Sequence, residues 1–292
     1  MFNTTIPDSS MTYTDFFRLM YLRRYALHRY QYSYLHKAST EGKVYFKPLF
    51  FDYPSDSQAY NRIEHNILLG DSIKLSPILE NLLTTSFYFP EKKAKWCPLW
   101  PGKINKCFDG GSEQKQATIN YDDVWVHLKS GSIIPMQLGD LNNVTKNLNI
   151  DKLRNETLDL AILCDTLYKA DGFIIYDDGE TQNLDEYTEF YVNATGFSPF
   201  LPGTNYIDVD VTAVYDKATK KDTKDQTLGS VVVYNAAQFS LKASAKLKLT
   251  TKGQPFETMN TYDSKNDIAR FILKEGTEVN LRDIDHIYIS SK

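Results

Sequence analysis

Three short apolar runs separated by turn residues, all between residues 43 and 79, constrain the fold of this chain more than any other feature. The first run, 44–51, is rich in aromatic residues, as half-buried strands are, and Pro54-Ser55-Asp56-Ser57 follows it. These four residues favour a turn, because proline lacks a backbone donor and serine and aspartate bond to nearby backbone. A second run, 67–69, meets Gly70-Asp71, and a third, 73–78, alternates with a period of two. The stretch predicts strand, turn, strand, turn, strand.

Residues 12–41, before this stretch, predict one long amphipathic helix that follows a polar tail, residues 1–11. Thr12 is a candidate N-cap, and Asp15 is an acid in the first turn, where the helix dipole favours negative charge. Gly42 lies just past the expected helix, as a C′ glycine does. The apolar residues recur at mixed three- and four-residue spacings: Phe16, Phe17, Met20, Tyr21, Tyr25, Leu27, Tyr32 and Leu35.

After residue 43 the pattern has a period of two, which is typical of strands. The expected strands are 84–89, 95–100, 116–120 and 124–128, and then 158–163, 171–176, 188–192, 207–215, 228–234, 245–250, 268–273 and 284–289. The polar, turn-like segment 138–154 separates the two groups. We therefore predict a mainly β fold in which one long N-terminal helix precedes two antiparallel β-sandwich domains, with boundaries 1–42, 43–140 and 141–292.

Composition excludes several classes of protein. A length of 292 residues allows two domains, and 42% hydrophobic residues with twenty tyrosines exclude disorder. The formal charge of −4 argues against a nucleic-acid partner, which requires a basic surface. The basic run Arg23, Arg24, His28 and Arg29 is compatible with a phosphate site, but we interpret it as a solvated or ion-paired helix face. No apolar run is long enough for a membrane span, and residues 1–15 lack the apolar segment of a signal peptide.

Three cysteines are too few for a disulfide scaffold and lack the spacing of metal ligands, so we predict no metal site. Cys97 and Cys107 could form a disulfide in an oxidising compartment, and two thiols are equally compatible with the sequence. Asn-x-Ser/Thr sequons at Asn3, Asn143, Asn155 and Asn193 are possible N-glycosylation sites. They favour a secreted location, which would require further sequence upstream of residue 1.

Four motifs resemble the C-terminal part of family 31 glycoside hydrolases, the α-glucosidases of lysosomal, intestinal and endoplasmic-reticulum type. The stretch 44–56 resembles V-x-x-x-P-L-F-F-[DE]-[FY]-P-x-D, and 68–79 resembles L-L-G-x-x-[IL]-x-x-[AS]-P-[IV]-L. Residues 126–137 resemble V-x-x-R-x-G-x-I-[IL]-P-x-Q, and 176–181 resemble [WY]-D-D-G-[EQ]-[ST]. Upstream, 24–42 resembles the helix pattern R-Y-x-L-x-x-x-x-Y-x-x-x-x-x-A-x-x-x-G. The resemblance covers roughly residues 20–185.

This resemblance implies the last helix of a catalytic (β/α)8 barrel followed by a proximal and a distal β-sandwich. Retaining glycosidases use two carboxylates about 5–5.5 Å apart, and in this family both follow middle strands of the barrel. Neither the nucleophile motif W-x-D-M-N-E nor the R-N-H element occurs here. We therefore assign no catalytic residue, no substrate-binding residue and no cofactor. Lys47 stands where the family usually has arginine, and Phe51 stands where some relatives have histidine, which puts a carboxylate clamp there in doubt.

The carboxylate pairs that remain have simpler interpretations. Adjacent strand residues point to opposite faces, so Asp177-Asp178-Gly179 and Asp122-Asp123 indicate tight turns rather than catalytic dyads. Glu64 lies next to His65, but the sequence supplies neither a nucleophile nor a third orienting group near them.

The resemblance implies a region that braces the barrel of a retaining α-glucosidase, which hydrolyses terminal α-linked glucose, and we expect this chain alone to be inactive. Its expected partner is that barrel, or another protein surface that covers the N-terminal helix. If the chain belongs to a longer precursor, the secretory pathway is expected, either lysosomal or extracellular. The alternative is a stand-alone structural or carbohydrate-binding β-sandwich protein. Trp96, Trp100 and Trp125 would support carbohydrate binding only as exposed, coplanar rings, and strand aromatics more often lie in a core.

Overall fold

The computed structural model describes residues 11–77, 85–100, 106–116, 125–138, 149–182, 185–197, 205–217, 226–251, 254–256, 258–274, 276–277 and 279–291. The chain divides into two compact units. The first comprises Met1–Arg24 and Val44–Ser130, and the second comprises Tyr25–Lys43 and Gly131–Lys292. The predicted boundary after residue 140 differs from this division, because residues 132–137 pair with strands of the second unit. No helix in the described ranges is long and apolar enough to cross a membrane.

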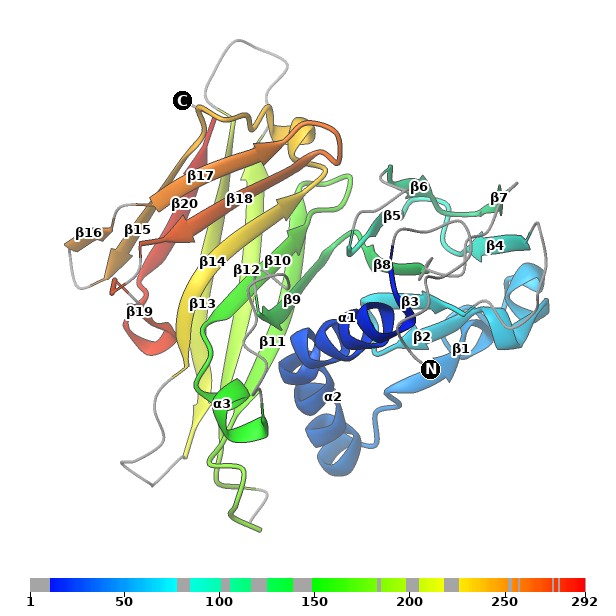
Figure 1. Cartoon of the computed structure of the whole chain (residues 1–292), viewed down its shortest axis with the longest axis horizontal. Coiled ribbons are helices and arrows are strands. Elements are labelled where there is room, and N and C mark those ends of the chain that lie inside the picture. The colour runs from blue at the N-terminus through cyan, green and yellow to red at the C-terminus, as the bar shows by residue number, and fades with distance from the viewer. Residues whose placement is uncertain are drawn as a thin grey trace. The chain divides into compact units, whose positions relative to one another are not determined.

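The first unit contains two described sheets (Figure 1). The larger sheet has the order β1-β2-β3-β8-β5-β6, and β4 pairs with β7 in the smaller sheet; all these pairs are antiparallel. The strands are β1 (Phe46–Pro48), β2 (Ile67–Leu69), β3 (Ile73–Ser76), β4 (Thr85–Phe89), β5 (Lys95–Pro98), β6 (Phe108–Asp109), β7 (Ser112–Gln116) and β8 (Trp125–Lys129). Aromatic residues dominate the buried core, which includes Phe87, Phe89, Trp96, Phe108 and Trp125.

The strand expected over 44–51 is shorter in the structure. After β1 the chain enters a 3-10 helix, Leu49–Phe51, and two further 3-10 helices follow at Ser57–Tyr60 and Ile63–His65. Buried Leu49 and Ala59 anchor this segment in the core. Local hydrogen bonds close its turns, with Tyr53 N donating to Leu49 O at 3.0 Å and Asp56 N to Tyr53 O at 3.1 Å.

The single helix expected over 12–41 is divided at Leu27 into α1 (Tyr13–Ala26) and α2 (His28–Glu41). Leu27 has φ −91° and ψ 3°, which lies in the bridge region rather than the helical region. Gly42 has φ 73°, and its backbone N–H caps the C-terminus of α2 by donating a hydrogen bond to Ala38 O at 3.2 Å. Glycine adopts this left-handed backbone conformation at a lower cost in free energy than other residues, because it has no Cβ.

The second unit contains a large curved sheet with the order β16-β15-β20-β13-β12-β11-β9-β10-β14-β18-β17, and β19 pairs with β14 (Figure 1). Its strands are β9 (Ser132–Gln137), β10 (Leu158–Leu163), β11 (Lys169–Tyr176), β12 (Thr188–Phe197), β13 (Tyr206–Asp216), β14 (Thr227–Tyr234), β15 (Lys246–Thr251), β16 (Gln254–Phe256), β17 (Thr258–Asp263), β18 (Ile268–Leu273), β19 (Val279–Asn280) and β20 (His286–Ser290). The short helices are α3 (Ile150–Arg154) and the 3-10 helices Ala236–Phe239 and Leu281–Asp283.

The two ends of this sheet approach each other. Asn260 on β17 donates to Ala245 O, just before β15, at 2.8 Å. One buried core therefore joins residues from both halves of the sheet, among them Val192, Val209, Val231 and Phe271. The prediction of a mainly β fold with sandwich-like domains is confirmed. Antiparallel pairing is not complete, however, because β10 runs parallel to β14 and β11 runs parallel to β9.

Helix α2 packs on the sheet of the second unit rather than standing free. Ile175 N on β11 donates to the buried Ser33 Oγ at 2.9 Å, and Lys37 forms an ion pair with Glu189 of β12 at 2.9 Å. Arg29 is also buried, with its guanidinium 4.8 Å from the centre of the Tyr176 ring. The interpretation of the basic run as a solvated or ion-paired face is therefore wrong for Arg29, because this side of the helix faces the sheet.

Candidate functional site

The first unit contains an open polar pocket of about 420 Å³ beside the turn that the sequence singles out. This volume falls within the range of roughly 300–1,000 Å³ typical of small-molecule sites. The pocket is lined by three carboxylates, four hydroxyl groups, one lysine and one glycine: Asp52, Asp56, Glu91, Tyr53, Ser55, Ser57, Tyr88, Lys92 and Gly111.

One wall of the pocket is the turn at residues 54–57, and side-chain hydrogen bonds hold its shape. Asp56 precedes the 3-10 helix Ser57–Tyr60, and its Oδ1 accepts a hydrogen bond from Gln58 N at 3.0 Å. An aspartate that caps a helical turn in this way satisfies a backbone donor that would otherwise lack a partner. The same carboxylate accepts a hydrogen bond from Tyr88 OH through Oδ2 at 2.6 Å, which ties the turn to β4.

The opposite wall depends on a close approach of two backbone segments. Glu91 has φ 65°, an uncommon conformation for a residue other than glycine. A Cβ atom on Gly110 would lie 2.0 Å from Glu91 O, and one on Gly111 would lie 2.4 Å from Lys92 Cγ. Glycine at position 110 is therefore required, because the atom it would meet belongs to the backbone.

Lysines compensate the charge of two pocket carboxylates. Lys129 Nζ lies 2.6 Å from Glu91 Oε2 and donates to Tyr53 OH at 3.0 Å. The buried Lys47 Nζ lies 2.8 Å from Asp52 Oδ2 and 2.6 Å from Asp71 Oδ1. Lys47 thus contacts two carboxylates through a single point charge, whereas an arginine would present a planar fork.

The pKa values of the two pocket tyrosines, Tyr53 and Tyr88, and of the neighbouring Lys129 are all raised. Burial is the main cause that raises the pKa of Tyr53 to about 12. Burial and the hydrogen bond to Asp56 also raise the pKa of Tyr88. Burial lowers the pKa of Lys129, but Tyr53 and Glu91 outweigh that effect and raise it overall. At neutral pH both phenols are protonated and Lys129 is charged, so neither type of group can act there as a general base.

In the second unit, Asp177 and Asp178 are engaged in the turn that follows β11. Asp177 Oδ1 accepts from Gly179 N at 2.9 Å, and Tyr32 OH of α2 donates to Oδ2. Asp178 Oδ1 accepts from Glu180 N at 2.9 Å and from Thr181 N at 2.7 Å. These contacts agree with the interpretation of Asp-Asp-Gly as a turn. Asp122-Asp123 lies outside the described residues.

Glu64 and His65 do not form an acid–base pair suited to catalysis. His65 is 2% exposed, and its Nδ1 lies 3.0 Å from Pro77 O, while its Nε2 lies 3.5 Å from Glu64 Oε1. A buried imidazole that bonds a backbone carbonyl has a structural role here. Phe51, in contrast, is 56% exposed beside the pocket turn.

The tryptophans do not form an exposed platform for a sugar. Trp96 and Trp125 are buried, at 0% and 3% exposure. Trp100 is half-buried, with the Arg23 guanidinium 5.5 Å from its ring centre. These rings stabilise the core of the first unit, so the carbohydrate-binding hypothesis loses its expected aromatic support.

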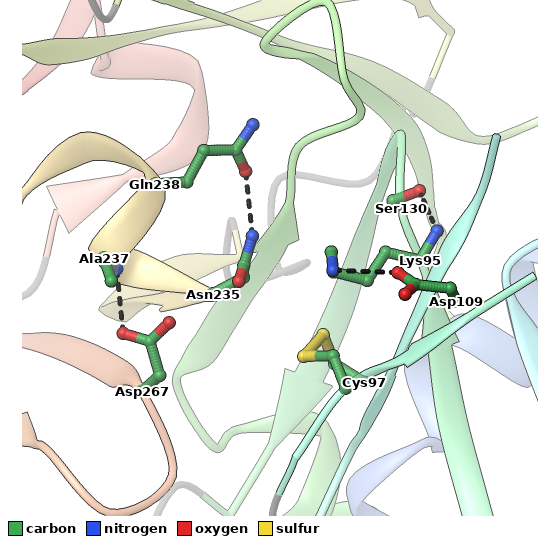
Figure 2. Close-up of a disulfide and its surroundings, with 9 residues drawn as sticks. Lys95, Cys97, Asp109, Ser130, Asn235, Ala237, Gln238 and Asp267 are labelled. Carbon is green, nitrogen blue, oxygen red and sulfur yellow. Dashed lines mark hydrogen bonds and ion pairs between the residues drawn. A yellow bond between two sulfur atoms is a disulfide. The ribbon is translucent and has the colours of Figure 1, made fainter.

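Cys97 and Cys107 form a disulfide that continues the β5–β6 ladder beyond the Lys95–Asp109 and Trp96–Phe108 pairs. Figure 2 shows this disulfide together with Lys95, Asp109 and Ser130.

Of the four sequons, Asn3 and Asn143 lie outside the described residues. Asn155 is exposed at the end of α3, whereas Asn193 is half-buried in β12 between β11 and β13. Glycosylation at these positions stays a prediction.

Two clusters were not expected from the sequence. The fully buried Lys74 on β3 lies opposite the buried His127 on β8. On the second unit, Asp208, Asp210 and His286 place possible ligand atoms within 4.8 Å of one another. The two ring nitrogens of His286 already contact the two carboxylates, at 2.6 Å and 3.3 Å, so this cluster is explained by contacts among its own side chains. Neither cluster has a local sequence signal, because strand pairing brings the residues together.

Residues 42–134 match the model of the glycosyl hydrolase family 31 C-terminal domain. This chain contains a family 31 C-terminal domain. It is 28% identical over 165 residues to probable maltase-glucoamylase 2 of Homo sapiens, covering 56% of this chain and 6% of that protein. It is 26% identical over 177 residues to lysosomal alpha-glucosidase of Bos taurus, covering 56% of this chain and 18% of that protein.

A similarity of fold covers nearly the whole chain. A chain from the structure of the heterodimeric ER glucosidase II complex, which consists of a catalytic subunit and the binding domain of a regulatory subunit, aligns with a TM-score of 0.70. The alignment covers 98% of this chain and 30% of that chain at 12% identity. The recognition of a family 31 C-terminal portion from the sequence motifs is confirmed. The chain spans only a small part of the length of the relatives that it matches.

Proposed function

We propose that this chain is the C-terminal bracing region of a retaining α-glucosidase-type enzyme that hydrolyses terminal α-linked glucose. The observation that carries the proposal is the match of residues 42–134 to the family 31 C-terminal domain, in a chain whose fold aligns with 30% of a larger enzyme chain. The names of the relatives also motivate a location in the secretory pathway, since they include a lysosomal and an ER glucosidase. The catalytic (β/α)8 barrel would be supplied by a further polypeptide segment.

The first expectation is that the chain alone has no glycosidase activity. The carboxylates of Asp177 and Asp178 are engaged by backbone donors of their own turn, and the pocket carboxylates of Asp52 and Glu91 are paired with lysines. No p-nitrophenol should be released from p-nitrophenyl α-glucoside above background by the purified chain. Turnover that is abolished by Asp177→Asn or Asp178→Asn would refute the proposal.

A second expectation concerns the partner surface on α1. Phe17 and Tyr21 lie one helical turn apart and are 50% and 60% exposed. Each exposed large apolar side chain forgoes roughly 1.5–3 kcal/mol relative to burial. The stripe formed by Phe17 and Tyr21 should therefore be covered in the complete enzyme. The stripe is smaller than the sequence indicated, because α2 already packs on the second unit and Tyr32 bonds Asp177.

Sedimentation of the chain should show concentration-dependent self-association, or a complex when the barrel portion of a family 31 α-glucosidase is supplied separately. The double variant Phe17→Ser, Tyr21→Ser should be monomeric and should not bind the barrel. Leu167→Ser is the matched control, because Leu167 is 71% exposed on the second unit and should leave association unchanged. A wild-type chain that stays monomeric and ignores the barrel portion would exclude this surface as the docking site.

The polar pocket favours a second candidate, the stand-alone carbohydrate-binding protein. The two candidates are compatible in one molecule, since a bracing region can also bind a sugar. They differ in whether the chain requires a barrel to function, which the sedimentation experiment addresses.

A further inference from the structure

We propose that the pocket around Asp52 and Ser57 is a binding site for a neutral, polyhydroxylated ligand, a hexose or a short oligosaccharide. All the residues that line this pocket belong to the first unit. The proposal goes beyond the bracing function and does not depend on it.

Charge compensation is the first argument for a neutral ligand. Asp52 is paired with Lys47 and Glu91 with Lys129, while Asp56 accepts hydrogen bonds from Tyr88 and Gln58. An anionic ligand would be repelled by these carboxylates. A cationic ligand would have to compete with lysines that already lie 2.6–2.8 Å from them.

The donor set also argues against a metal ion. In the part of the chain that the structure describes, the only cluster with three possible metal ligands within 4.8 Å is Asp208, Asp210 and His286, on the other unit. The three pocket carboxylates therefore do not bring their oxygen atoms within this distance of one another. They are spaced instead around a volume of about 420 Å³, which suits a molecule with several hydroxyl groups.

The lining offers groups that complement sugar hydroxyls. Ser55 and Ser57 each supply a hydroxyl that can donate and accept, and both residues are exposed. Asp52 and Glu91 each use one carboxylate oxygen in their lysine pairs, so the other oxygen can accept from a ligand hydroxyl. Tyr53 and Tyr88 add ring surface, which can contact the apolar C–H groups of a sugar.

The pocket wall is held in a conformation that costs free energy. Glu91 adopts φ 65°, and its carboxylate is fixed by Lys129 and by Tyr53 OH, which donates at 3.2 Å. Gly110 packs directly against the backbone of Glu91. Strained residues held by their surroundings cluster at binding sites, where the strain is offset by preorganisation.

Maltotriose is a suitable probe, since it is neutral and rich in hydroxyl groups. Saturation-transfer NMR and calorimetric titration of the full 292-residue chain should detect saturable binding. Ser55→Trp should fill the pocket and weaken binding by about tenfold or more, which corresponds to at least about 1.4 kcal/mol. Ser264→Trp, the same substitution in an exposed turn of the second unit, should bind like the wild type.

A second variant separates loss of binding from loss of folding. Tyr88→Phe keeps the ring but removes a lining hydroxyl and its hydrogen bond to Asp56, so it should weaken maltotriose binding by a few fold. Circular dichroism melting should show that all three variants are folded. Absence of saturable binding to the wild type, equal binding by Ser55→Trp, or displacement of maltotriose by calcium or inorganic phosphate would each overturn the proposal. None of these outcomes affects the barrel-docking experiment, so the two proposals fail independently.

Discussion

Replacing Lys74 with methionine is expected to stabilise the first unit by up to about 5 kcal/mol at pH 6, and by much less above pH 10. Lys74 is fully buried, and this burial lowers the pKa of its amine from 10.5 to about 7. Each pKa unit corresponds to 1.36 kcal/mol of differential stability. Methionine has a similar length and carries no charge to desolvate, so it should fill the same space.

The surroundings of Lys74 explain the cost of its charge. Its Nζ donates to Ser76 Oγ and lies 5.0 Å from the centre of the Phe89 ring, and no carboxylate forms an ion pair with it among the described residues. His127 on the neighbouring strand is also buried, and both of its ring nitrogens lack a hydrogen-bond partner. Burial and the nearby Lys74 hold the pKa of His127 well below its ordinary value.

The sign of the pH dependence follows from proton linkage. Between about pH 7 and 10.5 the unfolded chain holds a proton on Lys74 that the folded chain has released. The free energy of unfolding of the wild type therefore rises with pH across this window and is lowest below it. The measurement is urea unfolding of wild type and Lys74→Met at several pH values, with the fluorescence of the tryptophans of the first unit as the probe.

Lys129→Met is the matched control on β8. Lys129 has carboxylate and phenol partners that raise its pKa, so its charge contributes stability that is lost only as pH rises through that pKa. Its replacement should destabilise the chain near neutral pH, which is the opposite sign. A stability difference between Lys74→Met and wild type that is the same at pH 6 and pH 10 would show that Lys74 is not neutralised by burial.

Trp96→Ala is expected to destabilise the first unit by about 3–5 kcal/mol, the usual cost of truncating a large buried aromatic side chain. Trp96 is 0% exposed within the aromatic core, and its Nε1–H donates to Pro90 O at 3.1 Å. The substitution leaves a cavity and also removes the partner of a backbone carbonyl next to Glu91. Chemical unfolding monitored by circular dichroism measures the effect.

Trp100→Ala is the control for Trp96→Ala. Trp100 is half-buried and contacts Arg23 through its ring face, so the substitution should cost less than half as much. Equal effects of the two substitutions would contradict the assignment of Trp96 to the core. Because Pro90 O adjoins the pocket wall, Trp96→Ala should also weaken maltotriose binding, whereas Trp100→Ala should not.

Local chemistry made the turns of the first unit predictable. Pro54 to Ser57 form the expected turn, and Gly42 has the positive φ expected of a C′ glycine. The turn at Asp177-Asp178-Gly179 was predicted for the same reason, since aspartate side chains bond to backbone N–H groups two or three residues later. Each of these features depends on neighbours in the sequence, and a single sequence contains that information.

The pocket was only partly predictable. Its turn wall was visible in the sequence, but Tyr88, Glu91 and Gly111 come from other strands and turns. No local pattern indicates that the segment 90–92 packs against Gly110. The positive φ of Glu91 could not be inferred, because glutamate rarely adopts it without tertiary contacts that offset the strain.

By itself, the sequence determined the mainly β class, the family resemblance and the local turns, because strand alternation and turn propensity act over a few residues. Only the tertiary structure decided that Lys74 is buried. The alternation in β3 says that Lys74 and Ser76 share a face, but burial of that face depends on Phe87 and Phe89 from another strand. The parallel pairing of β10 with β14 and the packing of α2 on β11 are likewise tertiary, since residues far apart in sequence supply the contacts that offset their ordering.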